Sequence, residues 1–201
     1  AAECIFDLIT CMRVNINDIT AKAIYTALAT DTGCFKYSNV TQKTHLIAAS
    51  LYEHNIDAAE INRLMFDTKS RKLLELEKMV LDSAEFHFDD KCFLLTVTAE
   101  MQEKTGCSGT DLEGIAVISR SVEGIKAGVT IKQVGENEFK VSLRTYPPLD
   151  ASAICKKLGG GGHKAAAGAS VKGDLNEVKA KVLEAVKSAM EESNAGTSTA
   201  K

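Results

Sequence analysis

Apolar residues recur at intervals of three and four through residues 1–67, so this segment is predicted to be entirely helical. Gly33 stands where a glycine commonly ends a helix. Four helices are expected. The first, from Glu3 to Met12, begins in mid-helix, and the next three start at Asn17 or Asp18, at Thr41 and at Asp57. The second helix should bury one stripe, formed by Ile19, Ala23, Ile24, Ala27 and Leu28.

Residues 68–84 place leucine and valine among Lys, Arg and Glu, which predicts an amphipathic helix joining two lobes. From residue 85 the pattern becomes mixed. One strand is expected at Cys92–Thr98, and residues 125–133 and 138–144 form a hairpin around Gly135-Glu136-Asn137. Further helices should start at the capping box Thr110–Glu113, at Asp150 and at Asp174.

These elements predict an α/β (mixed α+β) protein, because helices and strands share the second lobe. Residues 1–67 form a helical lobe, 68–84 a connecting helix and 85–192 a domain with a mixed sheet. Residues 193–201 are small and polar and are expected to form a flexible tail.

The composition is that of an ordinary globular protein, with 45% hydrophobic and 25% charged residues among 201. The net charge of −3 argues against a nonspecific polyanion binder, which would carry a basic excess. A local pocket for a short phosphorylated ligand remains compatible with it. No apolar run approaches the ~18 residues of a membrane span, so no membrane contact is expected.

The six cysteines form no C-x-x-C pair and no metal-finger spacing. In a chain that can bury a core of this size, they are predicted to be scattered buried thiols. Free thiols indicate a reducing compartment, and the protein is therefore expected in the cytoplasm.

The run Gly159-Gly160-Gly161-Gly162 followed by His163 is the most informative motif. Four glycines lose much backbone entropy on ordering, which suggests that bare backbone is needed there. Because small, helix-prone residues follow, the run should open a helix whose amides bind a phosphate, with His163 beside them. The alternative is a glycine cap that ends the preceding helix.

Asp31 falls at the end of the second predicted helix, where a carboxylate opposes the negative end of the helix dipole. A divalent metal could compensate it, since hard cations take carboxylate oxygens. The alternative is a solvated turn aspartate.

Arg144 ends a predicted strand, and its guanidinium could bind a phosphate through two hydrogen bonds. The alternative there is a surface ion pair.

The segment from Gly159 to Gly168 resembles the DHH-associated domain, the substrate-binding half of the DHH phosphoesterase superfamily. Ser142-Leu143-Arg144 before it resembles the oligoribonuclease and phosphoadenosine-phosphate phosphatase branch. Asp31-Thr32-Gly33-Cys34-Phe35 resembles the last catalytic motif of the same proteins. The Asp-His-His triplet of the family is absent, so the chain is expected to be the C-terminal portion of a longer protein.

The resemblance implies that Asp31 is one ligand of a two-metal centre holding Mn²⁺, or Mg²⁺. It assigns substrate binding to Arg144, His163 and the glycines Gly159, Gly160, Gly161 and Gly162. The intact protein would then hydrolyse short oligoribonucleotides or 3′-phosphoadenosine 5′-phosphate, with short RNA or nucleoside phosphates as partners and a homodimer among the allowed states. With one metal ligand, this chain alone is expected to be inactive.

Two other functions stay open. A related enzyme could hydrolyse cyclic dinucleotides, and only the shape of the pocket would separate the two. The glycine-histidine domain also resembles a noncatalytic nucleic-acid-binding module of alanyl-tRNA synthetases. The predicted hairpin and the Asp-Thr-Gly segment argue against that second alternative.

Overall fold

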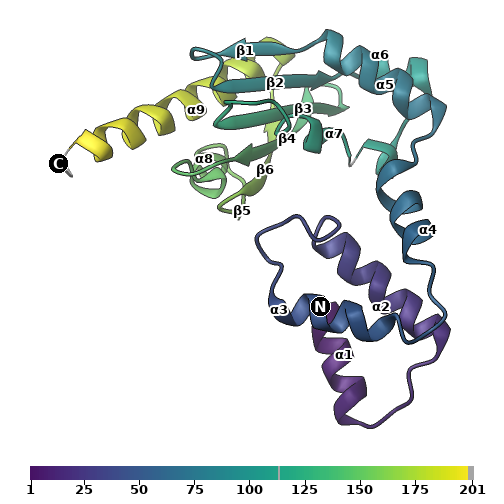
Figure 1. Cartoon of the computed structure of the whole chain (residues 1–201). Coiled ribbons are helices and arrows are strands. Elements are labelled where there is room, and N and C mark those ends of the chain that lie inside the picture. Colours follow the sequence, from purple (N-terminus) through teal and green to yellow (C-terminus); the bar gives the residue numbers. More distant parts are fainter. Residues whose placement is uncertain (113, 199–201) are drawn as a thin grey trace. The chain divides into compact units, whose positions relative to one another are not determined.

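The computed structural model describes residues 1–112 and 114–198, and side chains through residue 194. The chain divides into two compact units, residues 1–69 and residues 70–201 (Figure 1). The first unit is helical and the second contains a sheet covered by helices. The predicted α/β class is therefore confirmed.

Three helices of the first unit begin at polar caps in the predicted places, whereas the first helix has no side-chain cap. The Asn17 side chain accepts a hydrogen bond from Thr20 N, and Thr41 forms a reciprocal capping box with Thr44. Asp57 caps the fourth helix. The elements are α1 (Ala2–Cys11), α2 (Asp18–Asp31), α3 (Gln42–Leu51), α4 (Ala58–Asn62) and the π-helix η1 (Arg63–Asp67).

The face that α2 buries differs from the predicted stripe. Ile19 is 79% exposed, and Ala23 and Ala27 are exposed as well. Alanines occur around the whole helix, so their spacing does not distinguish its faces; the aromatic ring of Tyr25 does. The buried residues of α2 are Ala21, Ile24, Tyr25, Leu28 and Ala29, which pack with Ile47 and Leu51 of α3.

The second unit is built on a six-stranded sheet of order β1-β2-β3-β4-β6-β5. Only β2 and β3 are parallel; the other neighbouring strands are antiparallel. The strands are β1 (Glu85–His87), β2 (Cys92–Val97), β3 (Ala127–Gly135), β4 (Glu138–Thr145), β5 (Gly161–His163) and β6 (Ala166–Lys172). The helices are α5 (Arg71–Asp82), α6 (Ala99–Thr105), η2 (Gly109–Leu112), α7 (Ile115–Ile118), α8 (Ala151–Lys157) and α9 (Leu175–Ser198).

Helices cover the two faces of this sheet unequally (Figure 1). Residues of α8 and α9 share one core with the residues of β3, β4 and β6 that point to their side. The opposite face of β2 packs on α5, where Leu76 and Val80 are fully buried against Phe93 and Leu95. The helix expected to connect two lobes therefore belongs to the core of the second unit.

Several expectations for the second unit are wrong. The glycine run leads into the hairpin β5–β6 and not into a helix, because residues 166–172 pair with β4 in the sheet. Strand β1 and helix α6 were not predicted. The helix expected after Thr110 is a 3₁₀ turn followed by the short α7, and Glu113 of the predicted capping box lies outside the described residues. Helix α9 continues to Ser198, into the segment predicted to be a flexible tail.

Within the part of the chain that the structure describes, no helix combines the length and apolarity needed to cross a membrane.

The cysteines are only partly buried, which corrects the expectation of six buried thiols. Cys92, Cys107 and Cys155 are buried, Cys34 is half-buried, and Cys4 and Cys11 are exposed on α1. The six residues are free thiols. Burial raises the pKa of the Cys92 thiol to about 12, so its reactive thiolate form is suppressed at neutral pH.

This distribution predicts two classes of thiol in a labelling experiment. Cys4 and Cys11 should react rapidly with iodoacetamide in the native protein, while Cys92, Cys107 and Cys155 should react only after unfolding. Peptide mass spectrometry at pH 7.5, with and without guanidinium, measures both classes. Rapid native labelling of Cys92 would contradict the burial of β2.

Candidate functional site

The register of the sheet brings residues of β3, β4, β6 and β5 into rows on one face. Gly128, Arg144, Ala166 and His163 are successive cross-strand partners, and directly paired residues in antiparallel strands point to the same side. The next row is Thr130, Ser142, Gly168 and Gly161, and the third is Lys132, Lys140 and Ser170. We call this set of residues the polar face. It lies opposite the sides of β3, β4 and β6 that pack on α8 and α9.

On the polar face, Arg144 and His163 lie on either side of a surface formed by alanine and glycine, which have little or no side chain. They are separated by one strand, β6, which corresponds to roughly 10 Å across the sheet. Ala166 lies between them, and the adjacent row presents the bare backbone of Gly168 and Gly161. The His163 side chain is exposed and carries no hydrogen bond or ion pair with the described residues. Two of the predicted site residues therefore border one open surface.

Two hollows lie along the polar face and share Ser142. One has a volume of about 390 Å³ and is bordered by Lys140, Ser142, Ser170, Gly168 and the glycines 159–160. The other, of about 260 Å³, includes Arg144. Hydroxyl and cationic side chains therefore line a continuous strip that is concave on both sides of Ser142.

The first two glycines of the run end helix α8. Gly159 has φ +76°, and its amide donates to the Lys156 carbonyl at 3.1 Å. The Gly160 amide donates to the Cys155 carbonyl at 2.9 Å, which completes the i to i−5 bond of a Schellman cap. These two amides are occupied inside the protein, so the expected helix-start phosphate site is absent here.

The four glycines have different steric roles. A Cβ on Gly160 would lie 2.1 Å from the Gly168 carbonyl oxygen, and one on Gly162 would lie 2.6 Å from Ala167 Cα. Gly162 also has φ +149°. A Cβ on Gly161 would meet nothing within 4 Å. Gly160 and Gly162 are therefore needed for close packing of β5 against β6, whereas the Cβ positions of Gly159 and Gly161 face open space, and Gly159 has a positive φ instead.

Several residues of the polar face were missed by the sequence reasoning. Ser142 entered only as part of a motif, and Thr130, Lys132 and Lys140 did not enter as site residues. The signal was present: polar residues occur at every second position of 140–144, between buried Val141 and Leu143. That alternation marks one exposed face of a strand, and a hairpin pairs it with the matching face of its neighbour.

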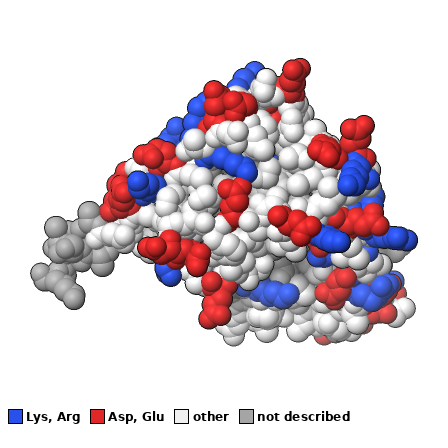
Figure 2. Space-filling view, turned by 90° about the horizontal axis from the view of Figure 1, so that it is seen from above, with Lys and Arg blue, Asp and Glu red and all other residues white. Residues whose placement is uncertain are grey.

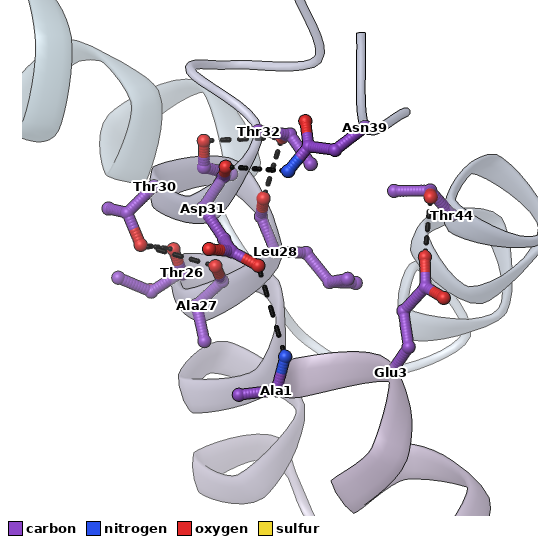
Figure 3. A network of polar contacts seen from close by, with 11 residues as sticks. Ala1, Glu3, Thr26, Ala27, Leu28, Thr30, Asp31, Thr32, Asn39 and Thr44 are labelled. Atoms are coloured by element: carbon purple, nitrogen blue, oxygen red, sulfur yellow. Dashed lines mark hydrogen bonds and ion pairs between the residues drawn. The ribbon is translucent and has the colours of Figure 1, made fainter. Parts of the chain in front are cut away.

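Asp31 lies in the first unit, at the last residue of α2 (Figure 3). Its side chain is 64% exposed, and Oδ2 lies 3.9 Å from the amino group of Ala1. The following residues form a fixed turn: the Thr32 hydroxyl donates to the Leu28 carbonyl at 2.6 Å and accepts from Phe35 N. Asn39 Nδ2 donates to the Asp31 carbonyl at 3.0 Å. The turn therefore presents the Asp31 carboxylate to solvent.

Gly33 of the same motif is required by the conformation and packing of the turn. Its φ is +56°, and a Cβ there would lie 2.2 Å from the Tyr37 ring. Thr32 and Gly33 thus build the turn. The metal-ligand assignment of Asp31 stays a prediction, and the structure adds no second ligand to it: among the described residues, no three of His, Cys, Asp and Glu gather in a metal-binding arrangement. The residues present do not fit a two-metal centre.

Charge is not concentrated on the surface that Figure 2 displays, where acidic and basic side chains are interspersed. This agrees with the net charge of −3. Recognition of an anion therefore depends on local groups such as those of the polar face, and not on a broad basic surface.

Comparison with known proteins identifies the family. The model described as the DHHA1 domain matches residues 90–192, about half of the chain. The chain therefore belongs to the DHHA1 domain family, and the resemblance noted in its glycine motif is confirmed.

Relatives with curated names extend the similarity through most of the chain. The bifunctional oligoribonuclease and PAP phosphatase NrnA of Thermus thermophilus is 36% identical over 188 residues, covering 92% of this chain and 56% of that protein. A probable bifunctional oligoribonuclease and PAP phosphatase NrnA of Streptococcus mutans is 26% identical, covering 85% and 54%. The chain thus spans about half the length of these relatives.

A solved structure shows the same fold. The exopolyphosphatase-related protein of Bacteroides fragilis superposes with a TM-score of 0.83 at 27% identity, covering 95% of this chain and 56% of that one.

Proposed function

We propose that the polar face binds the phosphate group of a short oligoribonucleotide or of 3′-phosphoadenosine 5′-phosphate. The protein would act as a phosphoesterase that hydrolyses such compounds. The observation that carries the proposal is the cross-strand row in which Arg144 and His163 border a floor of alanine and glycine. The names of the relatives support the substrate class, since they are oligoribonucleases and PAP phosphatases.

The chemistry of the row fits a phosphate. A guanidinium can donate two parallel hydrogen bonds to phosphate oxygens, and an imidazole adds a donor from the other side. Because Ala166 and Gly168 have little or no side chain, the phosphate can approach the sheet closely. The two hollows suit a ligand of one or two nucleotides better than a long polymer, and the mixed surface charge agrees with that.

The reaction in the whole protein would depend on divalent metal, with Mn²⁺ or Mg²⁺ as the ion and Asp31 as one ligand. Since the described residues do not form the metal centre, we assign this chain only the binding and orientation of substrate. Its free thiols favour the reducing conditions of the cytoplasm.

Titration calorimetry with adenosine monophosphate and no metal tests the phosphate site. Arg144→Ala should weaken binding about tenfold or more, because a lost hydrogen bond to a charged group is worth roughly 1.5–3 kcal/mol. His163→Ala should have a comparable or smaller effect. Arg144→Lys should restore only part of the affinity, since an ammonium lacks the planar fork.

Lys187→Ala is the matched control. It removes a positive charge from an exposed position on α9, the helix that covers the opposite side of the sheet. If Lys187→Ala weakens binding as much as Arg144→Ala, the effect is one of net charge and the proposed site is wrong. Unchanged affinity in Arg144→Ala would reject the site directly.

A further inference from the structure

The smaller hollow of the polar face has two kinds of lining. It lies over β2, β3 and β4 and extends under η2 and α7, with a volume of about 260 Å³. One wall is apolar and consists of Val97, Leu112, Ile115 and Ala116. The remaining lining is polar and consists of Thr130, Lys132, Ser142 and Arg144. We call this hollow the α7 recess.

The floor of the recess contains an unsatisfied hydroxyl group. Thr130 is 4% exposed, and its Oγ1 has no hydrogen-bond partner among the described residues. Buried hydroxyls in folded proteins are nearly always paired, because an unpaired one loses its bonds to water without compensation. A valine would fill the same space without that cost. Among the described residues nothing bonds to this hydroxyl, so it is available to a group that enters the recess; the equally unpaired Thr96 hydroxyl lines neither hollow.

The charges of the recess lie at its border. Lys132 and Arg144 are half-buried, whereas Thr130 and the apolar wall residues Leu112, Ile115 and Ala116 are buried. The donors of Ser142, Lys132 and Arg144 lie together at this half-buried border, where a phosphate can be bound. The buried part of the recess offers only the Thr130 hydroxyl beside four apolar side chains. An apolar wall with one placed polar group is typical of sites for uncharged ring systems.

We propose that the α7 recess receives the nucleobase of the nucleotide whose phosphate Arg144 binds. The ring lies against Ile115 and Ala116, and the Thr130 hydroxyl hydrogen-bonds to a polar atom at its edge. Arg144 borders the recess and also belongs to the row with His163, so base and phosphate occupy adjacent places. This inference rests on the proposed function and adds base recognition to it.

Two ligands distinguish the contribution of the base to binding from that of the phosphate. Adenosine monophosphate carries both, while ribose 5-phosphate carries the sugar and phosphate alone. Thr130→Val keeps the shape and removes the hydroxyl; it should weaken adenosine monophosphate binding by about threefold to tenfold and leave ribose 5-phosphate binding unchanged. Thr130→Ser keeps the hydroxyl and should bind both ligands much like the original protein.

Thr96→Val provides a control within the same sheet. Thr96 on β2 is also buried, at 2% exposure, and its Oγ1 is also without a partner among the described residues. It pairs with Ile131 and so points to the other side of the sheet. Thr96→Val should change neither affinity, and both valine variants should melt at or above the temperature of the original protein.

The outcomes distinguish the two proposals. Equal weakening of both ligands by Thr130→Val, or no weakening of adenosine monophosphate, would overturn the base recess and leave the phosphate site standing. Failure of ribose 5-phosphate to displace adenosine monophosphate, or its indifference to Arg144→Ala, would overturn the proposed function itself. If Thr130→Val does not fold, Ala116→Leu fills the recess from α7 and should give the same selective loss.

Discussion

Alanine at Gly160 or Gly162 should destabilise the second unit strongly, while alanine at Gly161 should leave its stability close to that of the original protein. The added methyl at Gly160 would overlap the Gly168 carbonyl oxygen, at 2.1 Å. At Gly162 it would overlap Ala167 Cα at 2.6 Å, and the backbone there has φ +149°. Backbone atoms cannot move aside as a flexible side chain can, so β5 and the glycines before it must separate from β6.

Overpacking of this kind costs about 1–3 kcal/mol at either position, and at Gly162 the positive φ forced on a residue with a Cβ adds a similar amount. Each of the two variants should therefore melt about 5 °C or more below the original protein. Differential scanning calorimetry measures the shift. Both variants should also lose adenosine monophosphate binding, because β5 carries His163 to its row.

Gly161→Ala and Gly161→Val separate folding from ligand contact. A Cβ at Gly161 meets no protein atom within 4 Å, and its φ is not positive, so both variants should fold. A ligand lying on the row of Gly168 and Gly161 would meet the valine, and its affinity should then fall while the melting temperature does not. If Gly160→Ala melts like the original protein, the assigned packing of the run against β6 is incorrect.

The glycine run also shows what the sequence could and could not predict. The types and order of its residues were enough to identify it as a family motif and to predict that it lies near Arg144. The strand after it did not, because Ala165–Ala167 has high helix propensity and only pairing with β4 makes residues 166–172 a strand. Helix propensity depends on the local sequence alone. The strand that pairs with residues 166–172 comes from a part of the chain that a local pattern does not include.

The same distinction explains the rest of the site. Caps at Asn17, Thr41, Asp57 and Asp150 were predictable, since each is a local bond between a side chain and an amide three residues on. The α7 recess was not predictable, because it depends on the register that sets Thr130 opposite Ser142. The buried face of α2 lies between these cases, since alanine spacing alone does not determine which side of the helix is buried, and the side that carries Tyr25 is the buried one.

The 201-residue chain should show no manganese-dependent hydrolysis of short oligoribonucleotides or of 3′-phosphoadenosine 5′-phosphate. A two-metal mechanism needs several ligands that hold two ions close together. Asp31 is 64% exposed at the end of α2, and no three candidate ligands gather among the described residues. Without such a centre, the rate enhancement of at least ~10⁶ that typical enzymes provide should be missing.

Product formation measured by ion-exchange chromatography, with Mn²⁺ and with EDTA, tests this expectation. The same preparation should bind adenosine monophosphate with the affinity that Arg144→Ala reduces, which shows that the protein is folded and that only turnover is absent. EDTA-sensitive product above the no-protein control would contradict the prediction, provided that Asp31→Asn abolishes it. Such a result would mean that Asp31 binds a metal ion together with ligands that the sequence did not predict. Those ligands should then be sought among the residues near its exposed carboxylate.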